Sequence, residues 1–187
     1  ETAPAAATER MFKPDETNLG HRAVGTPGTV RGLALAHKRH GKHKWRQLVL
    51  PAVRLAEEGF TIDAATAESL NDVLKDKDSA KFDELRRVYG THNPSEPWRA
   101  GDTLKQPELA ATLRLIADDG PDAFYAGKIA DQIVAEMKRG GGVITRDDLA
   151  RYEAKVREPI RGTYRGFDVF GPPPPSSGGI CLVEMLN

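Results

Sequence analysis

The stretch Pro172-Pro173-Pro174-Pro175-Ser176-Ser177-Gly178-Gly179-Ile180 marks the point at which the character of the chain changes. Its four prolines force an extended backbone that lacks hydrogen-bond donors. Ser177 is placed to cap a following helix, and the two glycines allow the backbone to approach a neighbouring segment closely. We predict a tightly packed strand-to-helix corner here. The alternative is direct contact of the exposed amides with an anionic ligand.

On either side of this corner the sequence periodicity differs. Residues 160–164 and 166–170 alternate and are rich in aromatic and β-branched side chains, with Arg165-Gly166 between them as a turn. This pattern predicts a β-hairpin over residues 160–171. Residues 172–187 are expected to form the proline-rich loop and the start of a helix.

Upstream of the hairpin, apolar residues recur at helical spacing. The first predicted helix has Pro27 as its first residue and stops at Gly41, and the second runs from Trp45 to Glu58, with Pro51 kinking or splitting it. Asp63 is the predicted N-cap of a helix from Ala64 to Lys75, and a short helix follows over residues 82–89. The last three predicted helices run from Pro107 to a stop at Gly120, from Asp122 to Arg139 with its end at Gly140-Gly141-Gly142, and onward from a capping box at Thr145. The chain is therefore predicted to be mostly α with a short C-terminal β-hairpin. We expect residues 1–187 to form one partial domain, whose residues 1–26 are irregular.

Composition excludes several classes of protein. Lys plus Arg and Asp plus Glu number 27 each, so there is no excess positive charge for nucleic acid. The longest apolar stretches are far shorter than the roughly 20 residues that a membrane-spanning helix needs, and we predict no membrane span. The single Cys181 excludes an internal disulfide and is interpreted as a free thiol in the core.

Other candidate sites lack essential partners. His37, His40 and His43 are three apart, but Gly41 and neighbouring lysines oppose a metal site, and we predict none. Ser176-Ser177 has no downstream histidine and no Gly-x-Ser-x-Gly elbow. The glycine run at 140–142 follows a predicted helix and lacks the Lys-Ser/Thr of a phosphate-binding loop, so we predict no cofactor.

Three stretches together resemble a known family. Residues 173–180 are similar to the PPPSSGG-I signature of the γ-glutamyltranspeptidase large subunit, Glu1-Thr2-Ala3-Pro4 to its R-E-x-A-P segment, and Gly20–Val30 to its G-x-x-A-V-G-V-P-G-T-V stretch. Their order and spacing agree with the family over the whole chain. The chain thus resembles the helical lobe of this large subunit.

The resemblance implies a fragment of the αββα sandwich of the N-terminal-nucleophile hydrolases. In that family a precursor cuts itself, and the Thr that heads the small subunit attacks γ-glutamyl amides such as glutathione. That Thr is expected beyond Asn187, so the resemblance implies no catalytic residue in this chain, inactivity of the chain alone, and the small subunit as partner. The family's Arg for the substrate α-carboxylate would precede Glu1, which places Glu1 beside the substrate pocket.

Two other functions stay open. A glutaryl-type or cephalosporin acylase has a similar large subunit, and a non-catalytic binding module could keep the same helical lobe. Arg10 and Arg22 match no family motif, and we expect both to be solvated surface residues. The family implies a periplasmic or extracellular location.

Overall fold

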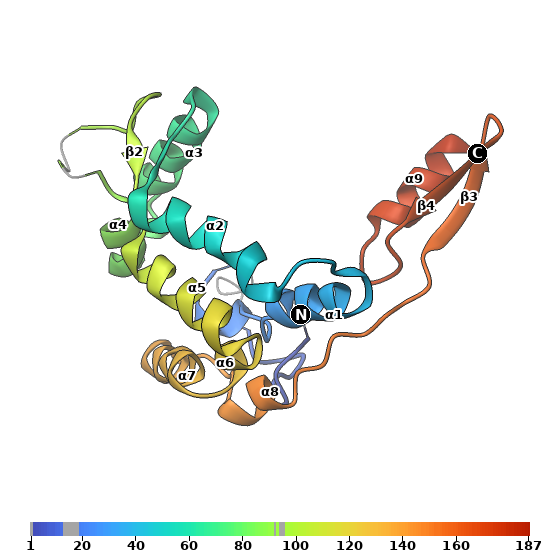
Figure 1. Ribbon diagram of the computed structural model, residues 1–187, viewed down its shortest axis with the longest axis horizontal. Coiled ribbons are helices and arrows are strands. Elements are labelled where there is room, and N and C mark those ends of the chain that lie inside the picture. The colour runs from blue at the N-terminus through green and yellow to red at the C-terminus, as the bar shows by residue number, and fades with distance from the viewer. Residues whose placement is uncertain (1, 13–18, 92, 94–95) are drawn as a thin grey trace. The chain divides into compact units, whose positions relative to one another are not determined.

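The computed structural model describes residues 2–12, 19–91, 93 and 96–187, in which helices dominate (Figure 1). The chain divides into two compact units, Glu1–Glu153 and Ala154–Asn187, each described here by itself. The predicted class, mostly α with a C-terminal hairpin, is confirmed. The assignment of residues 1–187 to one domain stays a prediction.

The first unit is built from helices and one short strand pair. Its elements are η1 (His21–Ala23), α1 (Thr29–His40), α2 (Trp45–Glu58), β1 (Phe60–Thr61), α3 (Ala64–Lys75), η2 (Ser79–Lys81), α4 (Asp83–Tyr89), β2 (Thr103–Leu104), α5 (Pro107–Asp119), α6 (Asp122–Tyr125), α7 (Lys128–Gly140) and α8 (Arg146–Ala150).

Helices α2 and α5 pack side by side along their lengths (Figure 1). Val53, Ala56 and Ala110 are buried between them, and the two alanines allow the helix axes to approach closely. The Trp45 indole Nε1 donates a hydrogen bond to the Ile116 carbonyl over 2.8 Å. Helix α2 continues through Pro51, which excludes the split, while the kink stays a prediction. A proline removes only one helical hydrogen bond, and the packing on α5 outweighs that loss.

Two further clusters of buried side chains lie at the ends of this pair. Helices α6, α7 and α8 bury Tyr125, Ala130, Met137, Ile144 and Leu149. Helix α3 and the strand pair bury Ile62, Ala67, Trp98 and Leu104. The antiparallel pair β1–β2 was not predicted, because two-residue strands are too short to show alternation.

Helix ends test the capping predictions. Asp63 caps α3 by accepting a hydrogen bond from the Thr66 amide, and Thr145 caps α8 in a capping box, as predicted. The single helix predicted over 122–139 is wrong: Gly127 has a φ of 74° and separates α6 from α7. Pro27 is not the first helical residue either, since α1 begins at Thr29.

The second unit is a hairpin covered by a helix. Strands β3 (Ile160–Tyr164) and β4 (Phe167–Gly171) pair antiparallel, and α9 (Gly178–Leu186) packs on both. Arg165 and Gly166 have φ of 48° and 85°, the backbone that a tight two-residue hairpin turn requires. The turn lies where the sequence predicted it.

The proline-rich corner between β4 and α9 is closely packed. A Cβ on Gly179 would lie 2.3 Å from the Pro172 carbonyl oxygen, and one on Gly171 would lie 2.5 Å from the Gly179 Cα. The predicted close approach is therefore confirmed. Ser177 occupies the N-cap position, but its side chain makes no cap bond; the Gly178 amide donates to Ser176 Oγ instead. Cys181 is exposed in this unit, and its prediction as a core thiol was wrong.

Candidate functional site

The segment Thr2–Ala5, called here the N-terminal segment, is held at two points. Thr2 and Thr26 form an antiparallel bridge, with the Thr26 amide 2.8 Å from the Thr2 carbonyl oxygen. Pro4 is buried, and its carbonyl accepts a hydrogen bond from the Ala7 amide over 2.9 Å. Glu1, the predicted substrate-binding residue, lies outside the described residues, and its role stays a prediction.

The Asp148 carboxylate provides the second anchor. Its Oδ1 accepts a hydrogen bond from the Ala5 amide over 2.7 Å, while Oδ2 accepts from the Thr145 amide at 2.8 Å and the Thr145 hydroxyl at 2.6 Å. Partial burial raises the pKa of this carboxyl, but the hydrogen bonds from Thr145 and Ala5 outweigh burial and leave the pKa below its ordinary value. An ionised carboxylate thus ties α8 to the N-terminal segment.

Tyr125 fixes the loop that contains Thr26. The side chain is only 1% exposed, and its hydroxyl donates to the Pro27 carbonyl over 3.0 Å and accepts from the Arg31 amide over 3.1 Å. The Arg31 guanidinium lies 4.4 Å above the tyrosine ring, and the Tyr152 ring stacks on it with centroids 5.8 Å apart. Burial is the main cause of a raised Tyr125 pKa, so the hydroxyl keeps its proton and can donate.

The residues before this loop dock on the end of α7. His21 Nε2 donates to Glu136 Oε1 over 2.6 Å, and its ring occupies the space where a Cβ on Gly140 would lie, 2.0 Å away. Arg22 donates to the Met11 carbonyl over 3.2 Å and the Gly141 carbonyl over 3.4 Å. The prediction of a solvated surface residue was therefore wrong for Arg22, because the residue is half-buried and these two carbonyls hold its guanidinium. Arg10 is exposed, as predicted.

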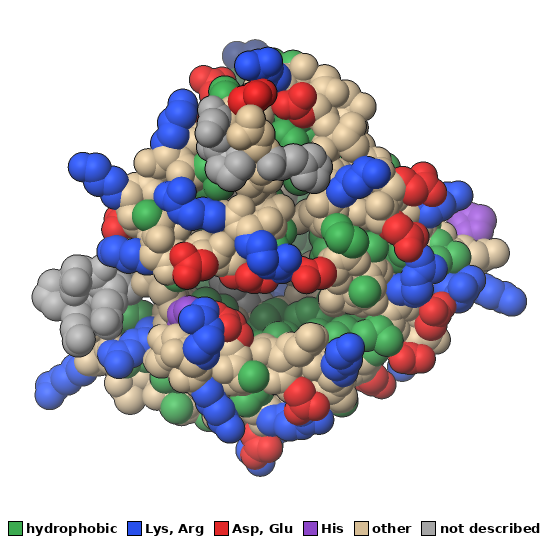
Figure 2. Space-filling model, turned by 90° about the vertical axis from the view of Figure 1, so that its left-hand side faces the viewer, with side chains coloured by type: hydrophobic (Ala, Val, Ile, Leu, Met, Phe, Trp, Pro, Cys, Tyr) green, Lys and Arg blue, Asp and Glu red, His purple; other side chains and the backbone are tan. Residues whose placement is uncertain are grey.

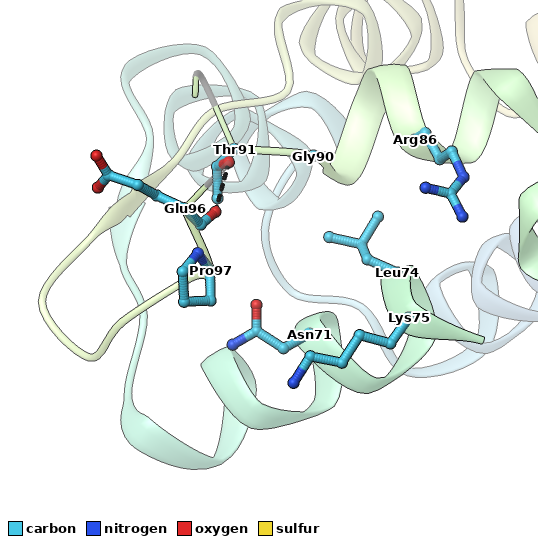
Figure 3. A pocket seen from close by; sticks show the side chains of 8 residues that line it. All are labelled: Asn71, Leu74, Lys75, Arg86, Gly90, Thr91, Glu96 and Pro97. Carbon is cyan, nitrogen blue, oxygen red and sulfur yellow. Dashed lines mark hydrogen bonds between the residues drawn. The ribbon is translucent and has the colours of Figure 1, made fainter. Parts of the chain in front are cut away.

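A separate pocket of about 520 Å³ lies between α3, α4 and the following loop (Figure 3). Lys75 and Arg86 supply its positive charge, but Figure 3 shows the ammonium and the guanidinium on different sides of the pocket. The Glu96 carboxylate points away from the other side chains drawn. The pocket therefore has no pair of charged groups that converge on one ligand atom.

Neither charge nor histidine placement forms a site in the described part of the chain (Figure 2). On the face in Figure 2, Lys and Arg side chains are interspersed with Asp and Glu. His37 Nε2 donates to the His43 carbonyl over 2.7 Å, and no group of three His, Cys, Asp or Glu side chains there is arranged to hold a metal ion. None of the described helices is long and apolar enough to cross a membrane.

The chain is similar in sequence to proteins of one known family. The family model described as Gamma-glutamyltranspeptidase matches residues 1–187. The chain belongs to this family. It is 44% identical to the glutathione hydrolase proenzyme of Escherichia coli K12, over all of this chain and 33% of that protein. It is 37% identical to the acylase ACY 1 proenzyme of Pseudomonas sp. SE83, over all of this chain and 35% of that protein.

The fold agrees with that of the family. The crystal structure of Helicobacter pylori γ-glutamyltranspeptidase matches with a TM-score of 0.92 and 37% identity, over all of this chain and 54% of that chain. This likeness confirms the predicted family, fold class and large-subunit region. The chain spans about a third of the length of the curated relatives described above.

Only part of the anchoring of the N-terminal segment is predictable from the sequence of this family member. The sequence predicted the capping box at Thr145, in which Asp148 takes part, but not the second bond of the Asp148 carboxylate. Its bond to Ala5 joins residues 143 apart, and the Tyr125 bond to Pro27 joins residues 98 apart. The pattern of residues within one helix or strand does not predict contacts between residues so far apart in the sequence. Coupled substitutions at the two positions across the family could have indicated them.

Proposed function

We propose that this chain is the large-subunit portion of an enzyme that hydrolyses or transfers γ-glutamyl groups of glutathione-like amides. The observation that carries the proposal is the match of the family model to residues 1–187. The E. coli relative, named a glutathione hydrolase proenzyme, supports this substrate class and a precursor form.

The family resemblance suggests which subunit contributes each part of the active site. A Thr at the head of the small subunit of the same precursor attacks the γ-glutamyl carbonyl, with its own α-amine as base. The large subunit contributes the substrate side, where an Arg preceding Glu1 holds the α-carboxylate in a two-pronged hydrogen bond. The proposal assigns no catalytic residue and no cofactor to residues 2–187. The anchored N-terminal segment supports a role for Glu1 beside the substrate.

Release of p-nitroaniline from γ-glutamyl-p-nitroanilide tests the function. We expect turnover by the two-subunit enzyme and none by the isolated 187-residue chain, because the nucleophile belongs to the small subunit. Absence of turnover in the two-subunit enzyme would refute the proposed function. Turnover by the isolated chain would refute the assignment of the nucleophile to the small subunit.

An acylase is the second candidate, favoured by the 37% identity to the Pseudomonas acylase proenzyme. A glutaryl group differs from a γ-glutamyl group by lacking the α-amine, so the two substrates isolate recognition of that amine. We expect γ-glutamyl-p-nitroanilide to be cleaved faster than glutaryl-p-nitroanilide. The reverse order would favour the acylase, and binding without turnover of either would favour a non-catalytic module.

The family resemblance also supports a periplasmic or extracellular location. Fractionation of cells that express the whole gene tests it, with activity expected outside the cytoplasmic fraction.

A further inference from the structure

The Asp148 carboxylate is shared between two segments far apart in the sequence. Oδ2 closes the cap of α8, and Oδ1 accepts the Ala5 amide over 2.7 Å. Hydrogen bonds from an amide to an ionised carboxylate are about twice as strong as those between neutral groups. A local cap needs only one of the two oxygens, so the second is available for holding the N-terminal segment.

This contact limits the positions that the start of the chain can take. Ala5 is fixed by Asp148, Thr2 is fixed by Thr26, and Pro4 is buried between these two points. Glu1 is the residue directly before Thr2 in the sequence. Loss of either anchor allows rotation about several backbone bonds next to Glu1. A displacement of about 1 Å at a substrate-binding group is enough to impair binding or catalysis.

We propose that Asp148 is a positioning residue, whose Oδ1 holds the N-terminal segment so that the substrate side of the site is preformed. The proposal rests on the proposed function, in which Glu1 lies beside the γ-glutamyl substrate. Asp148 touches no reacting atom and acts through Ala5.

Two substitutions act on the contact from opposite sides. Asp148→Asn removes the negative charge and leaves one acceptor oxygen for both the Ala5 amide and the Thr145 donors, so the bond to Ala5 loses its charge assistance even where that oxygen still accepts it. Ala5→Pro removes the donor and leaves the carboxylate intact. Ala5 is the second residue of the turn closed by the Ala7 amide and the Pro4 carbonyl, a position that favours proline.

Two further substitutions are controls. Thr145→Val removes the hydroxyl that bonds Asp148 Oδ2 and weakens the cap, but leaves the Ala5 bond. Asp147→Asn changes the neighbouring exposed carboxylate, which pairs only with Arg151 over 3.2 Å among the described residues. A purely structural role for Asp148 predicts that Asp148→Asn behaves like Thr145→Val.

The decisive experiment is steady-state kinetics of the two-subunit enzyme with γ-glutamyl-p-nitroanilide. We expect Asp148→Asn and Ala5→Pro each to raise KM about tenfold with kcat changed less than about twofold, as for loss of substrate binding. The double variant should be no worse than the more severe single variant, because both substitutions act on the same contact. Thr145→Val should lower the melting temperature and leave KM unchanged, and Asp147→Asn should change neither.

Amide hydrogen exchange of peptides covering residues 2–12 provides a readout that does not need activity. Faster exchange is expected in Asp148→Asn and Ala5→Pro but not in the two controls. Unchanged KM in both test variants of an active enzyme would overturn the proposal, and so would additive effects in the double variant. A wild-type enzyme without turnover would refute the proposed function instead. In that case unchanged exchange in Asp148→Asn would still refute the role of Asp148 in holding the N-terminal segment.

Discussion

Thr26 is fully buried, and no hydrogen-bond partner for its hydroxyl exists among the described residues. Its backbone pairs with Thr2, so the side chain is not needed for the bridge. A buried hydroxyl without a partner costs about 1–3 kcal/mol of stability. We predict that Thr26→Val, which keeps the shape and removes the hydroxyl, raises the free energy of unfolding by about 1 kcal/mol in urea titrations.

Thr2→Val is the matched control, because Thr2 is exposed in the same bridge and its change should stay within about 0.5 kcal/mol. A loss of stability in Thr26→Val would show that the hydroxyl has a partner in the folded protein.

At the scale of single residues, the sequence predicted a hydrogen bond only where its two partners are close together in the sequence. The caps at Asp63 and Thr145 were predicted, whereas the Asp148 bond to Ala5 depends on the tertiary fold.

At the scale of elements, the corner between β4 and α9 depends on glycine at one position and not at the next. A Cβ on Gly179 would lie 2.3 Å from the Pro172 carbonyl oxygen and 2.9 Å from the Gly171 carbonyl carbon, both backbone atoms that cannot move aside. Gly178→Ala would meet only Ser176 Oγ, at 3.6 Å. We predict that Gly179→Ala destabilises the second unit by about 1–3 kcal/mol.

Gly178→Ala is the control, and it should be neutral or stabilise α9 by up to about 1 kcal/mol, because alanine is the better helix former. Amide exchange of residues 160–186 measures both effects. Equal losses in the two variants would contradict the steric explanation.

Element types were predictable where periodicity extends over several turns, and element ends were less so. Helix α5 begins at Pro107 and ends before Gly120 as the sequence indicated. The break at Gly127 was missed because the apolar spacing on its two sides is compatible with one helix. The break separates α6, whose Tyr125 lies in the buried cluster and bonds the Pro27 carbonyl, from α7.

At the scale of the whole molecule, balanced charge takes the form of ion pairs that join separate elements of the first unit. Arg87 of α4 pairs with Glu84 and with Glu108 of α5. Glu136 of α7 pairs with Arg139 and accepts a hydrogen bond from His21 of the segment that leads to Thr26. The sequence gives equal numbers of acids and bases but not their partners, since pairing is decided by packing.

These ion pairs make stability depend on pH. Arg139 first, and His21 second, lower the pKa of Glu136 to about 2 from an ordinary value of 4.5. Because the folded pKa is the lower one, the charge of Glu136 stabilises the fold above about pH 4.5, and this contribution is lost as the pH falls toward 2. Glu136 is 46% exposed, so solvent screening limits the contribution to about 1 kcal/mol.

We therefore predict that Glu136→Gln lowers the free energy of unfolding by about 1 kcal/mol at pH 7, and that the difference from wild type shrinks by more than half at pH 3. Urea titrations at the two pH values measure it. Glu153→Gln is the control, because Glu153 is exposed and makes no ion pair with any described residue, and it should change little at either pH. A Glu136→Gln deficit that stays constant or grows from pH 7 to pH 3 would exclude the charge of Glu136 as its cause, and would assign the effect to altered packing of His21 on the end of α7.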